Sequence, residues 1–134
     1  MSPRPEIDVV DSTWICVRPA RLAAIVADPP NWRKWWPQLD LVVDEWRGEK
    51  GVRWTVRSAG SLGLSGSMEI WLEAVDDGVV AHYFLRLDGV AGPLGRRRAE
   101  RIERQFRRAV KQVLWGLADR LDPDRIARIG RPGR

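Results

Sequence analysis

Few side chains in this 134-residue chain are suited to chemistry. The single histidine, His82, is followed directly by the single tyrosine, Tyr83. An imidazole exchanges protons near neutral pH, and a phenol can donate a proton or orient a ligand carbonyl. A lone tyrosine in a strand more often has a packing role, because buried hydroxyls usually bond to backbone or water. We therefore name Tyr83 as the one catalytic candidate and assign no other catalytic residue.

A second group of polar residues could form the acid–base array that a cyclisation reaction needs. They are Arg57, Glu69, Glu73 and Arg86. Alternation along their segments puts all four on the face opposite the apolar residues, where His82 also falls. A β-bulge near Gly66 would reverse part of this assignment. Without a bulge, the interior has almost no acid–base groups, which favours a binding role over catalysis.

Metal and disulfide chemistry are not indicated. The chain has one cysteine, Cys16, and one histidine, whereas structural zinc sites use four Cys or His ligands. One cysteine also excludes an internal disulfide. Cys16 ends the first predicted strand without a pattern of cationic neighbours, so we expect a buried structural thiol. No metal and no cofactor are expected.

Positive charge is concentrated toward the C-terminus. The chain has 23 basic and 18 acidic residues, and a net charge of +5. Residues 1–95 carry 10 basic and 13 acidic side chains, whereas residues 96–134 carry 13 and 5. Such asymmetry marks nucleic-acid or membrane contacts in some proteins and a solvated helix face in others. The basic region has no platform of spaced Phe or Tyr residues and no groove-reading motif, so we do not expect nucleic-acid binding.

The length fits one domain, which we expect over residues 7–121. A loose N-terminus is expected at 1–6 and a flexible basic tail at 122–134. No apolar run approaches the roughly 18 residues that span a bilayer. The first ten residues lack the apolar core of a signal peptide, so we expect a cytoplasmic protein.

Hydrophobic periodicity predicts an α+β arrangement. Residues 19–27 have helical apolar spacing, and Asn31 is expected to cap a second, short helix over Trp32–Trp36. Apolar residues at 3.6-residue spacing predict one long amphipathic helix over Arg96–Leu121. The strands are expected at Ile7–Val17, Leu39–Trp46, Val52–Ser58, Ser67–Val75 and Val79–Leu87, with a hairpin turn at Asp76–Gly78.

The same alternation predicts which face of the sheet is buried. The residues expected to face the long helix are Trp54, Met68, Ile70, Leu72, Tyr83 and Leu85. Trp71 and Phe84 fall on the outer face, where they would form an exposed patch or contact a partner subunit. Trp115 falls opposite the apolar stripe of the long helix, where it could stack on Arg108 or Lys111 or anchor an interface. Trp71, Phe84 and Trp115 are therefore candidate contacts of a homodimer.

The order of elements and the segment DPPNWRKWWPQLDL resemble the START-like superfamily, also called SRPBCC, and within it the polyketide-cyclase/dehydrase and lipid-transport group. The likeness extends over residues 7–121. It implies a helix-grip fold, in which a curved antiparallel sheet wraps around a long C-terminal helix and two short helices follow the first strand. Family members usually have six strands after these helices, whereas four are predicted here. The resemblance therefore does not fix the volume of the cavity. The positions that match the family pattern are the helix Pro19–Val26, then Asp28, Trp32, Trp36 and Pro37, then the strand Gly51-Val52-Arg53-Trp54.

The resemblance implies a cavity between the sheet and the long helix that binds a small hydrophobic molecule, such as a lipid or polyketide. One alternative is a polyketide aromatase/cyclase, and another is a non-catalytic interaction protein whose core is filled. An RNA-facing role, known for some members, is a third. The lining expected for a cavity is Trp54, Met68, Ile70, Leu72, Tyr83, Leu85, Phe106, Val110, Val113 and Leu117.

Overall fold

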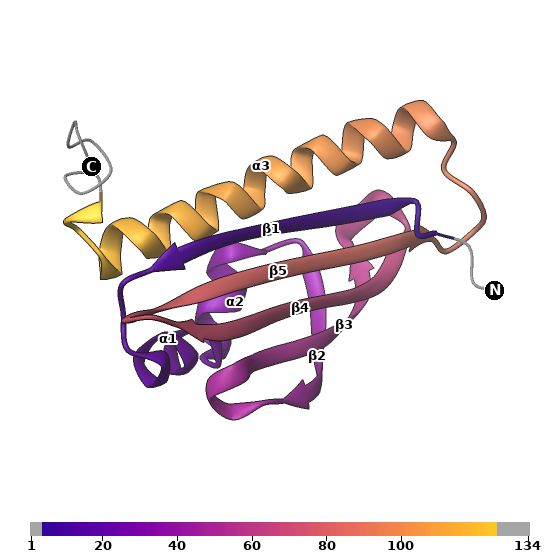
Figure 1. The fold of residues 1–134 in the computed structure, drawn as a ribbon. Coiled ribbons are helices and arrows are strands. Elements are labelled where there is room, and N and C mark those ends of the chain that lie inside the picture. The colour runs from indigo at the N-terminus through magenta and orange to yellow at the C-terminus, as the bar shows by residue number, and fades with distance from the viewer. Residues whose placement is uncertain (1–3, 126–134) are drawn as a thin grey trace, which may run out of the picture.

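The computed structural model describes residues 4–125, which form one antiparallel sheet and three α-helices (Figure 1). The remaining residues of the predicted N-terminal segment and basic tail, 1–3 and 126–134, lie outside the described residues. The strands are β1 (Ile7–Ile15), β2 (Leu39–Trp46), β3 (Gly51–Ala59), β4 (Leu64–Val75) and β5 (Gly78–Gly89). The helices are α1 (Pro19–Val26), α2 (Pro29–Trp35) and α3 (Arg96–Leu121), with single 3₁₀ turns at Gly48–Lys50 and Gly60–Leu62.

All neighbouring strands of the sheet are antiparallel, in the order β1-β5-β4-β3-β2. The predicted hairpin turn joins β4 to β5, and Asp76 there has a positive φ of 54°. The single 3₁₀ turn Gly60–Leu62 joins β3 to β4. Four strands therefore follow the short helices, as the sequence predicts.

The buried and outer faces of the sheet are those predicted from the alternation. The pairing of β4 with β5 runs through Gly66 without a register shift, and its pairing with β3 is regular up to Gly66. The bulge that would have turned the polar side chains inward is therefore absent at Gly66. The register shifts of the sheet lie instead in β2, at Asp40/Leu41 and Val43/Glu45. Glu69, Glu73, His82 and Arg86 thus stay on the outer face.

The expectation that Asn31 caps the second helix is wrong. The helix α2 begins earlier, at Pro29, because proline has a helical φ and lacks the N–H that the first turn leaves unpaired. Asn31 therefore lies inside α2, and its side-chain amide donates to the carbonyl of Ile25 at 2.9 Å. It satisfies a carbonyl at the C-terminal end of α1 and so joins the two short helices.

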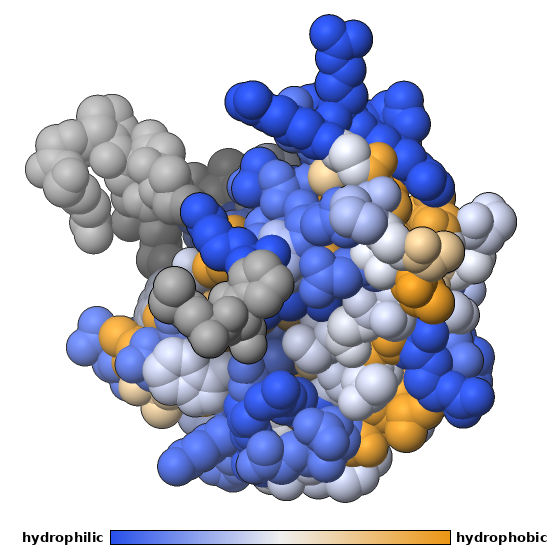
Figure 2. Space-filling model, turned by 90° about the vertical axis from the view of Figure 1, so that its right-hand side faces the viewer, coloured by the Kyte–Doolittle hydropathy of each residue, from blue (hydrophilic) through white to orange (hydrophobic). Residues whose placement is uncertain are grey.

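The long helix α3 lies along β1, at one edge of the sheet (Figure 1). Its Glu103 accepts a hydrogen bond from the backbone N–H of Asp8 at 2.9 Å, and Lys111 lies 3.3 Å from the Asp11 carboxylate. A helix that covers an edge strand protects backbone groups that would otherwise be open to pairing. Where α3 begins, hydrophilic side chains project from the top of the molecule (Figure 2).

One further expectation needs correction, at Cys16, whereas Trp54 is completely buried as expected, with its ring packed on Trp32 and Trp36 near the short helices. Cys16 is not buried: it lies just after β1, half-exposed, with its Sγ 3.8 Å from the Asp77 carbonyl oxygen.

Candidate ligand-binding site

An aromatic cluster occupies the interior between the sheet and the short helices. Trp32 and Trp36 come from the α2 region, and Trp54 and Tyr83 come from β3 and β5. The Trp54 ring lies 5.1 Å from Trp32 and 5.9 Å from Trp36, both edge to face, and Trp36 stacks on Tyr83 at 5.9 Å. Such pairs add about 0.5–1.5 kcal/mol to the free energy gained by burial. Four large aromatic side chains therefore pack together beside the short helices.

The hydrogen-bonding groups of this cluster are incompletely matched. The Trp32 indole N–H donates to the carbonyl of Val26. By contrast, no group among residues 4–125 accepts a hydrogen bond from the buried indole nitrogens of Trp36 and Trp54. A buried donor that is left unpaired costs about 1–3 kcal/mol. An acceptor atom placed next to either indole nitrogen would therefore stabilise the folded protein.

The catalytic candidate Tyr83 is poorly placed to transfer a proton. Its hydroxyl is buried and its hydrogen-bond partner is the Met68 sulfur, at 3.2 Å. A thioether is a weak acceptor and does not exchange protons. Burial raises the pKa of Tyr83 well above its ordinary value of 10.0, because the phenolate would lose its hydration. The geometry supports a packing or orienting role for this hydroxyl.

The predicted lining residues come together in one hydrophobic core. Val113 is partly buried, and each of the other nine is at most 5% exposed. Two of the ten, Val113 and Leu117, also line a pocket that opens between α2 and α3. The other eight predicted lining residues lie in the buried core and line no part of this pocket.

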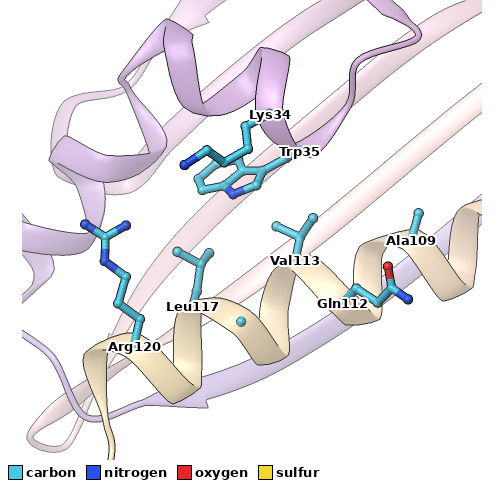
Figure 3. A pocket seen from close by; sticks show the side chains of 8 residues that line it. Lys34, Trp35, Ala109, Gln112, Val113, Leu117 and Arg120 are labelled. Carbon is cyan, nitrogen blue, oxygen red and sulfur yellow. The ribbon is translucent and has the colours of Figure 1, made fainter.

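The pocket between α2 and α3 has a volume of about 280 Å³. In Figure 3 the Trp35 ring of α2 faces Val113 and Leu117 of α3, which form the apolar walls. Lys34 and Arg120 lie toward one end, and Ala109 and Gln112 toward the other. Its lining residues are Lys34, Trp35, Ala109, Gln112, Val113, Gly116, Leu117 and Arg120.

The sequence analysis did not single out six of these eight residues. Lys34, Gln112 and Arg120 are polar residues that periodicity assigns to solvent, and Gly116 has no side chain. Their common site depends on how α2 and α3 approach each other across about 80 residues of chain. The sequence feature that could have indicated this site is Trp35, an aromatic residue that directly follows the cationic Lys34.

Other pockets lie elsewhere in the described part of the chain. One, of about 310 Å³, lies beside Glu6 and the start of α3, and two more lie near α2 and at the end of β4. The pocket near α2, of about 420 Å³, lies between α2 and β2 and includes Arg33, Trp36 and Asp40. The pocket at the end of β4, of about 310 Å³, lies beside Trp71 and Glu73. Of the predicted lining residues these three pockets contain Leu72 alone, so the pocket between α2 and α3 corresponds better to the predicted site.

The polar residues of the outer face are engaged in ion pairs. Glu73 lies 3.1 Å from Nε2 of His82, which also stacks on Trp71 at 4.6 Å. Glu69 pairs with Arg47. The side chains that could have served a cyclase thus point away from the core.

Asp122, at the end of α3, is the one buried carboxylate of residues 4–125. It accepts a hydrogen bond from the backbone N–H of Cys16.

The candidate homodimer contacts differ in exposure. Trp115 is 53% exposed, with Lys111 5.8 Å from its ring centre, which matches one of the two predicted cation–π partners. Trp71 is 37% exposed, whereas Phe84 is half-buried. Trp46, which the sequence analysis did not single out, is 57% exposed at the end of the edge strand β2.

Within residues 4–125, no helix combines the length and hydropathy needed to cross a membrane. The same residues contain no group of three or more His, Cys, Asp or Glu side chains placed to hold a metal ion.

Comparison with known proteins supports the fold. No protein-family model matches the sequence, and no curated protein matches it significantly. The solution structure of the Aha1 dimer from Colwellia psychrerythraea matches with a TM-score of 0.59 at 13% identity, covering 87% of this chain and 96% of that one. The crystal structure of TTHA0849 from Thermus thermophilus matches with a TM-score of 0.53 at 15% identity, covering 85% and 96%. The predicted helix-grip fold is thereby confirmed, and the assignment to the polyketide-cyclase group stays a prediction.

Proposed function

We propose that the chain binds a small hydrophobic molecule against the long helix, in the pocket between α2 and α3. The observation that supports this most directly is the pocket's wall of Trp35, Val113 and Leu117, which leaves apolar surface next to an opening.

The proposed role is binding without catalysis. A cyclase would need groups that move protons inside the site, and Tyr83 is held in its protonated form by burial. Arg57, Glu69, Glu73 and Arg86 lie on the outer face. An aromatase/cyclase is therefore the less supported alternative.

The test is native mass spectrometry of the purified protein, followed by denaturation and extraction of the same sample. We expect the native species to carry a defined extra mass that denaturation releases. A pocket-filling variant, Gly116→Phe, should lose that mass, because Gly116 lines the pocket and an added Cβ meets no atom within 4 Å. Gly116→Ala is the matched control and should keep it. Wild-type protein without bound mass, and without response to added apolar compounds, would contradict the proposal.

An interaction role is the second candidate, and the exposure of Trp115 and Trp46 favours it. Exposed tryptophans are enriched among the residues that dominate protein–protein contacts. The Aha1 structure that this fold resembles is a dimer.

A further inference from the structure

The pocket between α2 and α3 has a cationic end. Lys34 comes from α2 and Arg120 from α3, and both line the same pocket. Figure 3 shows both side chains toward one end, while Ala109 and Gln112 lie toward the other. Two elements far apart in the sequence therefore bring two positive charges to one small opening.

These two charges are not matched by acidic side chains of the described residues. Neither Lys34 nor Arg120 forms an ion pair within residues 4–125. Asp119, the sequence neighbour of Arg120, pairs with Arg125 at 2.9 Å instead. Both cations lie in the last turn of their helix, where the partial negative charge of the helix end is favourable but smaller than a unit charge.

The remainder of the pocket is apolar. Trp35 lies on one wall, and Val113 and Leu117 lie on the other. The volume of about 280 Å³ is just below the range typical of ligand pockets, roughly 300–1,000 Å³, so only a small molecule fits. An apolar wall beside two cations complements a small molecule that has an apolar body and a negatively charged head.

We propose that the ligand is a small single-chain amphiphile with an anionic head group such as a carboxylate. Lys34 and Arg120 bind the head, and Trp35, Val113 and Leu117 contact the apolar body. A guanidinium and an ammonium suit a carboxylate because both donate charge-assisted hydrogen bonds. This inference rests on the proposed function and specifies the ligand class of the same site.

The experiment compares two probes with the same chain length, octanoate and 1-octanol. Each is titrated into the ¹⁵N-labelled protein, and the shift of the Gly116 amide resonance gives the dissociation constant. We expect octanoate to bind about tenfold more tightly than 1-octanol, which corresponds to roughly 1.4 kcal/mol. The double variant Lys34→Gln/Arg120→Gln should weaken octanoate binding about tenfold and leave 1-octanol binding unchanged.

A matched control separates local recognition from general attraction by a basic protein. Arg21→Gln/Arg104→Gln removes the same charge from two exposed residues outside this pocket and should leave both affinities unchanged. Arg120→Lys, which keeps the charge, should retain most of the octanoate affinity.

The outcomes distinguish this inference from the proposed function. Equal affinity for octanoate and 1-octanol, or equal losses in the double variant and the control, would overturn the anionic head while leaving a hydrophobic site. Failure of both probes to bind would overturn the hydrophobic site and this inference together.

Discussion

Trp54 lies at the centre of the interior aromatic cluster, and its whole side chain is buried. We expect Trp54→Ala to lower the free energy of unfolding by about 3–5 kcal/mol, because deletion of a buried aromatic ring leaves a cavity. Urea unfolding measures this loss. Trp46→Ala, at a position that is 57% exposed, is the control and should cost clearly less. An unchanged unfolding midpoint for Trp54→Ala would show that this ring is not part of the core.

Tyr83 predicts how the free energy of unfolding depends on pH. Because it is the only tyrosine of the chain, any tyrosinate signal comes from this residue alone. Its pKa is raised above 10.0 in the folded protein, whereas in the unfolded chain it titrates near 10. Above about pH 10 the unfolded state therefore binds fewer protons than the folded state, and the free energy of unfolding falls as pH rises.

The measurement is the ultraviolet absorbance of the tyrosinate ion during an alkaline titration. We expect the tyrosinate signal to appear together with the loss of tertiary circular dichroism, well above its position in denaturant. A tyrosinate signal that appears in the folded protein near pH 10 would show that Tyr83 is accessible to solvent.

Gly51, the first residue of the family-like motif Gly51-Val52-Arg53-Trp54, occupies a position that has no room for a Cβ atom. It has a φ of 110°, which favours glycine, and it begins β3 beside β4. A Cβ at this position would lie 2.0 Å from the carbonyl oxygen of Ile70. The motif residue is thus explained by a close approach of two strands, and it needs no role in chemistry.

At the scale of elements, the Glu6 side chain fastens the loop between β5 and α3 to the start of β1. The Glu6 carboxylate accepts hydrogen bonds from the backbone N–H groups of Gly89 at 3.3 Å and Leu94 at 2.7 Å. In the sequence this Gly- and Pro-rich segment has the composition of a flexible connector. In the fold, the start of β1 is close enough to fasten the loop.

We expect Glu6→Ala to increase hydrogen exchange at the Leu94 amide, by an amount that corresponds to about 1–3 kcal/mol of lost protection. The reason is that two backbone donors lose a charged acceptor. Glu49→Ala, which removes an exposed carboxylate at a distant turn, is the control and should leave Leu94 protected. Equal exchange in wild type and Glu6→Ala would show that the loop is held by other contacts.

At the scale of the whole molecule, the exposed tryptophans raise the question of self-association. We expect Trp115→Ala to change the free energy of unfolding by no more than about 0.5 kcal/mol, because the ring packs on the surface. If the chain forms a dimer through α3, the same variant should sediment as a monomer under conditions where wild type does not. Sedimentation of both proteins as dimers would exclude Trp115 as the main contact.

Much of the fold could be predicted because it depends on local patterns. The 3.6-residue apolar spacing defined Arg96–Leu121 as a helix, and strict alternation assigned Trp54 and Tyr83 to the buried face. The error at Asn31 arose because the two preceding prolines can start the helix themselves.

By itself the sequence determined the order of the elements, the faces of the sheet and the absence of an obvious catalytic array, since each depends on residue types and their spacing. Only the tertiary structure decided that α3 lies along β1, that Trp36 and Trp54 pack together, and that Lys34 and Arg120 share a pocket. The physical reason is that packing between distant segments depends on side-chain volume and on how the helices approach each other. Neither quantity is contained in the periodicity of a single segment.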